Sequence, residues 1–208
     1  MGFLTVTVDA HDLTGPKAPL SLIQNNMESI LRGAGHYAYR LIRRWVADIG
    51  QTRHGTATRL GATPTNHYKG SDVAPPVVFD NEVSIAINTP GISRAFGDLH
   101  IRPVEARSLA IPMHRDAYGL QPRELTDRGE HLFRILRRGE HRGSEPTNIL
   151  YRRDPNGGLE AMYALVGAVN QPQDRTLLPP DDQLSAQFAK GAKKAIKAVL
   201  QMQSAGVV

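Results

Sequence analysis

One long amphipathic stretch constrains the fold of this chain more than any other part of it. Apolar residues recur there every three or four positions, which places them on one face of a helix. They are Ile23, Met27, Ile30, Leu31, Ala34, Ala38, Leu41, Ile42, Trp45 and Ile49. Ser21 and Gln24 match a capping box at the start. The sequence therefore predicts a helix over 22–49 with Trp45 in the core.

Two glycines interrupt this predicted helix. Gly33 and Gly35 each destabilise a helix by about 1 kcal/mol relative to alanine. A kink, or a division into two helices, is therefore predicted near residue 34.

A second amphipathic stretch closes the chain. Pro179-Pro180 precedes Asp181-Asp182, and acidic residues favour a helix N-terminus. The apolar face that follows is formed by Leu184, Phe188, Ala192, Ala195, Ile196, Val199 and Leu200. The sequence predicts a C-terminal helix that packs on the rest of the chain.

Shorter segments between the two helices alternate apolar with polar residues or are rich in β-branched types, which is typical of strands. Asp80-Asn81 suits a tight turn, and Asn156-Gly157 supplies the positive φ angles that a hairpin turn requires. The segments with strand character are 3–9, 77–80, 82–87, 108–112, 131–137, 148–153 and 160–166.

Helices near both ends, with strands between them, predict an α+β fold. We expect a single domain over residues 1–208, in which an antiparallel β-sheet packs against a long N-terminal helix and a C-terminal helix. Residues 50–76 have no periodicity and contain several glycines and prolines. Together with 113–130 they are predicted to be extended arms or long loops.

Several classes of chemistry lack their sequence signature. With 0 cysteines the chain has no disulfide and no thiolate nucleophile. The sequence contains no glycine-rich phosphate loop and no G-x-S-x-G motif. It also has no apolar run long enough to span a bilayer. Residues 1–6 lack a basic region followed by a long apolar one, so we do not expect secretion through a cleaved leader. We therefore expect a protein that is not an enzyme, binds no cofactor or metal, and does not enter a membrane.

The histidines leave one alternative open. None of the 8 has a second histidine four residues away, the spacing that puts two imidazoles on one helix face. The tetrapeptide Arg-Gly-Glu-His occurs at both 128–131 and 138–141. A metal-dependent hydrolase could use Glu130, His131, Glu140 and His141. Charged turn residues around one strand or helix are the favoured interpretation.

Positive charge is concentrated between residues 32 and 69, within a chain of formal net charge +5. The single acid in this block is Asp48, and its bases are Arg32, Arg40, Arg43, Arg44, Arg53, Arg59 and Lys69. A solvated arginine face on an amphipathic helix is the favoured interpretation. The alternative is a basic nucleic-acid-binding domain that contacts phosphates. Its candidate residues are Arg40, Arg43, Arg44, Arg53 and Arg59.

Three segments, in order along the chain, resemble bacteriophage tail-completion or virion-morphogenesis proteins. Residues 88–97 and 100–112 are similar to a glycine-containing turn followed by the motif I-x-P-x-x-A-[KR]-x-L-A-[IV]-P in that family. Residues 61–66 resemble the family's proline, threonine and glycine loop. Residues 169–180 resemble its proline-marked entry into the last helix.

This resemblance implies a structural protein that completes or terminates a phage tail and joins it to the head or neck. It implies assembly as a homo-oligomeric ring, commonly sixfold, with the tail tube and the neck or connector proteins as partners. The resemblance also implies a location in the virion after synthesis in the host cytoplasm. Viral DNA, in a passing contact, is a further candidate partner.

The expected subunit interface combines arginines with one apolar anchor, because arginine is enriched at interfaces. The residues expected to contribute are Arg53, Arg59, Leu60, Arg102, Arg107 and Arg115.

Overall fold

The computed structural model describes residues 2–7, 20–65, 68–89, 91–135 and 148–204, and these divide into two compact units. Unit 1 comprises Met1–Thr52, Asn66–Gly97 and Gln173–Val208, and unit 2 comprises Arg53–Thr65 and Asp98–Pro172. The fold is α+β, as the sequence predicts. The chain, which its sequence predicts to form a single domain, passes between these two units at four places.

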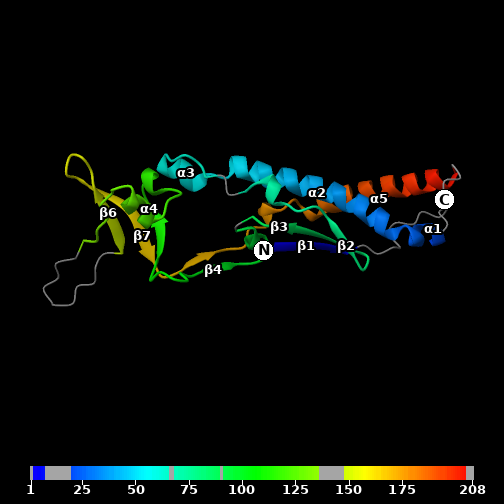
Figure 1. Cartoon of the computed structure of the whole chain (residues 1–208), viewed down its shortest axis with the longest axis horizontal. Helices are drawn as coiled ribbons and strands as arrows, with labels where there is room; N and C mark the ends of the chain where they lie inside the picture. The colour runs from blue at the N-terminus through cyan, green and yellow to red at the C-terminus, as the bar shows by residue number, and fades with distance from the viewer. Residues whose placement is uncertain (1, 8–19, 66–67, 90, 136–147, 205–208) are drawn as a thin grey trace. The chain divides into compact units, whose positions relative to one another are not determined.

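Two long helices form one layer of unit 1 (Figure 1). They are α2 (Met27–Thr52) and α5 (Asp181–Ser204), and a short helix α1 (Leu20–Asn25) precedes α2. The two helices approach closely because glycines lie at their contact. A Cβ on Gly191 would stand 2.8 Å from Ala34 Cα, and one on Gly33 would stand 2.9 Å from Ala195 Cβ. Gly35 instead faces the sheet, since its Cβ would stand 2.7 Å from Val83 Cγ1. Both glycines therefore allow close packing, and α2 is continuous through residue 34.

The helix break lies at Asn26 instead of near residue 34. The Asn26 backbone N–H donates to Ile23 O (3.1 Å), and its side-chain amide donates to Leu22 O (3.0 Å). This i to i+3 bond tightens the end of α1, and α2 then begins at Met27. The predicted division into two helices near residue 34 was wrong, because a local asparagine turn at residue 26 determines the break.

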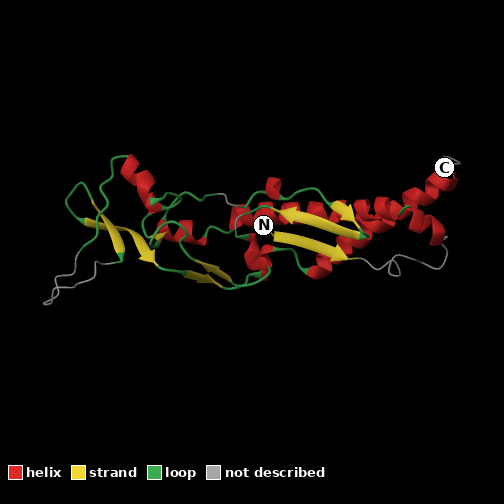
Figure 2. Cartoon of the chain, turned by 60° about the horizontal axis from the view of Figure 1, so that its bottom comes forward, coloured by secondary structure: helices red, strands yellow, loops and turns green. Residues whose placement is uncertain are grey.

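A three-stranded antiparallel sheet in the order β1-β3-β2 supplies the other layer of unit 1 (Figure 2). Its strands are β1 (Gly2–Thr7), β2 (Val77–Phe79) and β3 (Glu82–Ile87). Val83, Ile85 and Ile87 of β3 are buried in the core formed with α2 and α5. Asp80 and Asn81 turn between β2 and β3 with φ angles of 46° and 63°, which confirms the predicted turn.

Trp45 is half-buried at the edge of this core, so the prediction that it is a core residue holds in part. Its indole N–H donates to the backbone oxygen of Thr176 (3.1 Å). Because a buried indole N–H needs an acceptor, the ring lies where the 3₁₀ turn η5 (Arg175–Leu177) can supply one. A second turn, η3 (Ile92–Ala95), contributes Ile92 and Ala95 to the same core.

Unit 2 contains a three-stranded antiparallel sheet in the order β5-β7-β6. Its strands are β5 (Leu109–Pro112), β6 (Ile149–Arg153) and β7 (Leu159–Val166). A separate pair joins β4 (Leu99–Ile101) to β8 (Val169–Gln171). The single predicted sheet is thus three sheets within the described residues, because the later strands pair among themselves and not with β1 to β3.

The predicted arms contain packed structure. In 50–76, α2 continues to Thr52, helix α3 spans Gly55–Leu60 and the turn η2 spans Gly70–Asp72. Ala57 and Val73 are buried. The prediction of an extended arm or long loop is therefore wrong for 55–60 and 70–73, where small residues and single apolar residues are packed by tertiary contacts that leave no periodicity in the sequence. Residues 62–65 and 74–76 have no regular secondary structure.

The second predicted arm, 113–130, is also packed. It contains the 3₁₀ turn η4 (Arg115–Ala117) and helix α4 (Pro122–Asp127), which a capping box between Gln121 and Glu124 begins. Ala117 and Leu125 are buried against Met162 and Tyr163 of β7. The Tyr163 hydroxyl donates to Leu120 O (3.0 Å), which holds the segment on the sheet.

The predicted strand 131–137 reduces to one bridge among the described residues. Phe133 and Tyr151 exchange backbone hydrogen bonds of 3.0 and 2.8 Å. The remainder of that prediction, from residue 136 onward, lies outside the described residues. None of the helices in the described part of the chain is long and apolar enough to cross a bilayer.

Candidate functional site

Among the described residues of unit 2, a dense group of charged side chains surrounds Arg152 of β6. Its Nε and Nη2 atoms donate to Glu160 Oε2 at 3.0 and 2.6 Å, and Glu160 is its cross-strand partner on β7. Its Nη1 donates to Glu130 Oε1 (3.1 Å), and Nη2 also donates to Asp116 Oδ2 (2.9 Å). Arg152 therefore joins β6, β7, η4 and the segment after α4. We call these four residues the Arg152 cluster.

Electrostatics within the Arg152 cluster favour the charged forms. The Arg152 side chain is 14% exposed, and its hydrogen bonds to Glu160 and Asp116 raise its pKa above the ordinary value. The hydrogen bond from Arg152 lowers the pKa of Asp116 below its usual range, against a smaller opposing effect of burial. The guanidinium thus remains charged and directs its donors to carboxylates, so its role is to fix structure.

His114 lies beside this cluster. Its Nδ1 accepts from the Asp116 backbone N–H (3.2 Å), and its Nε2 lies 3.9 Å from Glu160 Oε1. Because Nδ1 accepts a hydrogen bond, the neutral ring carries its proton on Nε2, on the side of Glu160. The imidazole therefore contributes a weak polar contact to the Glu160 carboxylate.

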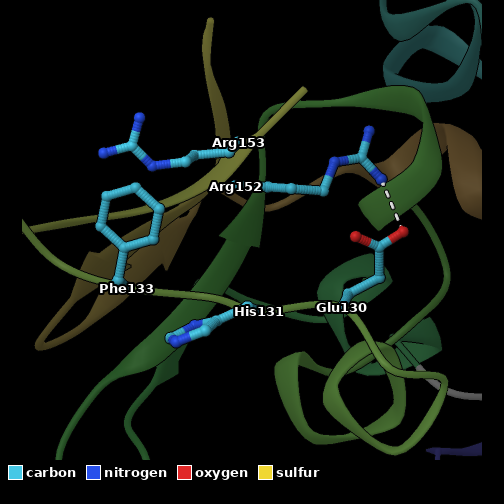
Figure 3. A pocket seen from close by; sticks show the side chains of 5 residues that line it. All are labelled: Glu130, His131, Phe133, Arg152 and Arg153. Atoms are coloured by element: carbon cyan, nitrogen blue, oxygen red, sulfur yellow. Dashed lines mark hydrogen bonds and ion pairs between the residues drawn. The ribbon is translucent and has the colours of Figure 1, made fainter. Parts of the chain in front are cut away.

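An open pocket of about 400 Å³ adjoins the Arg152 cluster. It is lined by Glu130, His131, Phe133, Arg152 and Arg153, and Figure 3 shows that Arg152 and Arg153 point to opposite sides of β6. The Arg153 guanidinium lies over the Phe133 ring at 5.9 Å from its centroid, and the His131 ring meets Phe133 edge-on. Arg152 is occupied by carboxylates, so Arg153 is the cation of this pocket that faces solvent.

The structure tests the proposed metal site only in part. Glu140 and His141 lie outside the described residues. Glu130 accepts a hydrogen bond from Arg152, and the exposed His131 ring contacts Phe133. Among the described residues, no three His, Asp or Glu side chains are grouped so that they could hold a metal ion.

The six residues expected at a subunit interface all belong to unit 2. The five arginines are exposed and Leu60 is half-buried at the end of α3. Arg102 Nε donates to His100 Nε2 (2.7 Å), and Arg115 Nε lies 3.5 Å from Asp116 Oδ1. The described residues thus place these arginines on the surface of one unit, and their role at an interface stays a prediction.

The five arginines of the alternative nucleic-acid site are divided between the units. Arg40, Arg43 and Arg44 lie on α2 in unit 1, whereas Arg53 and Arg59 lie in unit 2. A pocket of about 440 Å³ is lined by the first three together with Ala47, Gly70 and Ser71. The structure therefore brings three of the five around one depression.

Part of this geometry has no signal in the sequence. Asp116 and Glu130 meet Arg152 across 36 and 22 residues, and no local pattern marks such pairs. Arg152 and Glu160 flank a predicted hairpin turn, so their cross-strand pairing could have been inferred from the register. Comparisons of the chain with protein-family models, with curated proteins and with solved structures find no match.

Proposed function

We propose that this protein is a structural subunit that assembles with copies of itself into a ring, in the manner of the phage tail-completion proteins that its sequence resembles. Its partners are then the tail tube and the neck or connector proteins, and its location is the virion. The observation that carries the self-assembly part is the open, apolar edge strand β2 in unit 1.

Strand β2 ends the sheet order β1-β3-β2, so one side of its backbone has no strand partner among the described residues. Val77 and Phe79 are two residues apart, so they lie on the same face of this strand. Their exposed fractions are 64% and 74%. An exposed edge with large apolar side chains is a template for pairing with another chain. We call Val77 and Phe79 with the backbone of β2 the apolar edge.

The other end of the same sheet supports head-to-tail assembly. Strand β1 pairs with β3 over six residues and leaves its outer side open within the described part of the chain. Two different open edges on one sheet allow β2 of one copy to pair with β1 of the next. Such a heterologous contact forms a ring when the rotation between copies closes.

The energetics require more than the apolar edge. Full burial of a valine or phenylalanine side chain contributes about 1.5–3 kcal/mol, so these two partly exposed side chains contribute roughly 2–4 kcal/mol per contact. Association opposes this with at least about 4 kcal/mol of lost translational and rotational freedom. Backbone pairing and further contacts must add to it. The exposed arginines of unit 2, Arg102, Arg107 and Arg115, are the proposed source of such contacts.

Native mass spectrometry and sedimentation of the full chain test the assembly, alone and with purified tail tubes. We expect a closed oligomer that binds the tube end. The V77K/F79K variant should remain folded and become monomeric, because lysines on an edge strand oppose pairing. Phe96→Lys is the matched control, since Phe96 is 47% exposed in unit 1 and lies outside the strands.

Three results would contradict the proposal. The parent protein could be monomeric at every concentration, V77K/F79K could assemble normally, or Phe96→Lys could disrupt the oligomer as strongly as the edge variant. If the protein formed an oligomer that did not bind tail tubes, the self-assembly part of the proposal would stand and the phage-tail role would be rejected. Charge reversal of the three unit 2 arginines should leave a folded chain that assembles poorly, and normal assembly would remove them from the interface.

A further inference from the structure

We infer that the exposed face of α2 at Arg40, Arg43 and Arg44 binds the phosphate backbone of double-stranded DNA. We call this surface, with Ala47, Gly70 and Ser71, the arginine basin. The inference is independent of the proposed ring, since it rests on a surface of unit 1 that the apolar edge does not include.

The helix geometry gathers the cations. Positions 40, 43, 44 and 47 follow the i, i+3, i+4, i+7 spacing, so they share one face of α2. Arg40, Arg43 and Arg44 are exposed, whereas the fourth position carries the small side chain of Ala47. Three guanidinium groups therefore border a floor that no long side chain fills.

The opposite wall depends on a glycine. A Cβ on Gly70 would lie 2.8 Å from the Arg43 backbone oxygen and 3.1 Å from Arg43 Cγ. The absence of a side chain lets residues 70–72 approach α2 and places the exposed Ser71 at the rim. The resulting pocket of about 440 Å³ has room for a phosphodiester segment and offers a hydroxyl donor beside the arginines.

The cations of the arginine basin are not paired with carboxylates within the part of the chain that the structure describes. No carboxylate lines it. Among the described residues, Arg40, Arg43 and Arg44 form no ion pair. The carboxylate of Asp72, next to Ser71 in the chain, accepts a hydrogen bond from the Thr89 hydroxyl at 3.5 Å. Guanidinium groups bind phosphate oxygens with paired, charge-assisted hydrogen bonds, so the basin complements a polyanion.

The arrangement favours the backbone of a duplex over unpaired bases. Arg40 lies over the Tyr37 ring at 5.7 Å from its centroid, so that aromatic face is covered and cannot stack on a base. Residues 40 to 44 span about 6 Å along the helix, which corresponds to roughly two base-pair rises of about 3.4 Å along the axis of a duplex. The expected binding is therefore independent of sequence and sensitive to salt.

Fluorescence anisotropy with a labelled duplex of mixed sequence tests this inference on the full chain over 50–300 mM salt. Three phosphate contacts give a slope of log K against log salt near −2.7, since each contributes about −0.9. R43Q/R44Q should reduce the slope by about 1.8 and weaken binding at least tenfold at 100 mM salt. Glutamine is a good helix former, so α2 should persist, which circular dichroism checks.

The matched control is R123Q/R128Q, which removes the same charge from exposed positions in unit 2. It should bind DNA like the parent. If R43Q/R44Q and R123Q/R128Q weakened DNA binding equally, the effect would be due to net charge alone and the inference would be overturned. The inference would also be overturned if the protein did not bind DNA or bound it independently of salt. It would be overturned as well if polyglutamate displaced the labelled duplex at a lower concentration of charge than unlabelled duplex does. If R43Q/R44Q does not fold, Arg40→Gln alone should lower the slope by about 0.9.

Discussion

Replacement of Arg152 by glutamine should destabilise unit 2 selectively. The substitution removes the cation that three carboxylates share while it keeps a shorter, neutral polar side chain. Arg153→Gln is the matched control, because the neighbouring arginine is exposed and its recorded contact is a ring face and not a carboxylate.

The expected magnitude follows from exposure. Breaking a buried ion pair by removing one partner destabilises a protein by about 3–5 kcal/mol, whereas an exposed pair contributes about 0–1 kcal/mol. Arg152 is 14% exposed, but Glu160, Glu130 and Asp116 are 30%, 37% and 42% exposed and can regain water. Arg152→Gln should therefore lower the free energy of unfolding by about 2–4 kcal/mol. Arg153→Gln should lower it by less than about 1 kcal/mol.

Urea unfolding can separate the two units. Trp45, the single tryptophan, lies in unit 1, so its fluorescence follows that unit, whereas far-ultraviolet circular dichroism follows both. Arg152→Gln should shift the circular dichroism transition and speed hydrogen exchange at the Tyr151 amide, which donates to Phe133 O. If Arg152→Gln and Arg153→Gln unfold within 0.5 kcal/mol of each other, the cluster does not hold the segments together.

The same variant has a defined pH dependence. The folded state lowers the pKa of Asp116 from the ordinary 3.8, so its stabilisation is present above that value and is lost as pH falls below it. In Arg152→Gln the clustered carboxylates repel, and protonation relieves this repulsion. The stability difference between parent and variant should thus be largest near neutral pH and shrink below about pH 4.

Three other predictions concern the cores. Gly191→Ala should destabilise unit 1 by about 1–3 kcal/mol, because the new Cβ would meet the backbone of α2 at 2.8–2.9 Å. As a control, a Cβ at Gly55 would meet open space, so Gly55→Ala should leave the thermal unfolding temperature unchanged. Trp45→Ala should lower the free energy of unfolding by about 2–3 kcal/mol, less than a fully buried tryptophan would, and an unchanged urea midpoint would mean that the ring does not pack. Burial, with a smaller contribution from Glu124, raises the pKa of Tyr163 to about 12, so an absorbance titration should show one tyrosine ionising last, with stability falling between pH 10 and 12.

Local patterns predicted much of the fold. The periodic stripes gave both long helices, and the turn residues located the β2-β3 and β6-β7 hairpins. Gly157 adopts a positive φ of 85° as expected, while Asn156 instead donates its backbone N–H to Asp154 Oδ1. These features depend on neighbours within a few residues, which is why the sequence shows them.

The missed features depend on distant partners. Strands β4 and β8 have three residues each and pair across 70 positions at His100 and Asn170, too short for an alternating pattern. The Arg152 cluster and the arginine basin likewise combine segments far apart in the chain. Gly33 shows the converse error. Glycine weakens an isolated helix, but here a Cβ would lie only 2.9 Å from Ala195 Cβ of α5, so the residue allows close contact between the two helices.

The three-segment composition of unit 1 has a consequence for synthesis on the ribosome. The apolar face of α2 is covered by α5, yet well over a hundred residues separate Thr52 from Asp181. At a translation rate of about 5–20 residues per second, the apolar face of α2 stays uncovered for roughly 6–25 s before α5 begins to be synthesised. During this interval the nascent chain should depend on chaperones, and expression yield should respond to translation speed between these two helices.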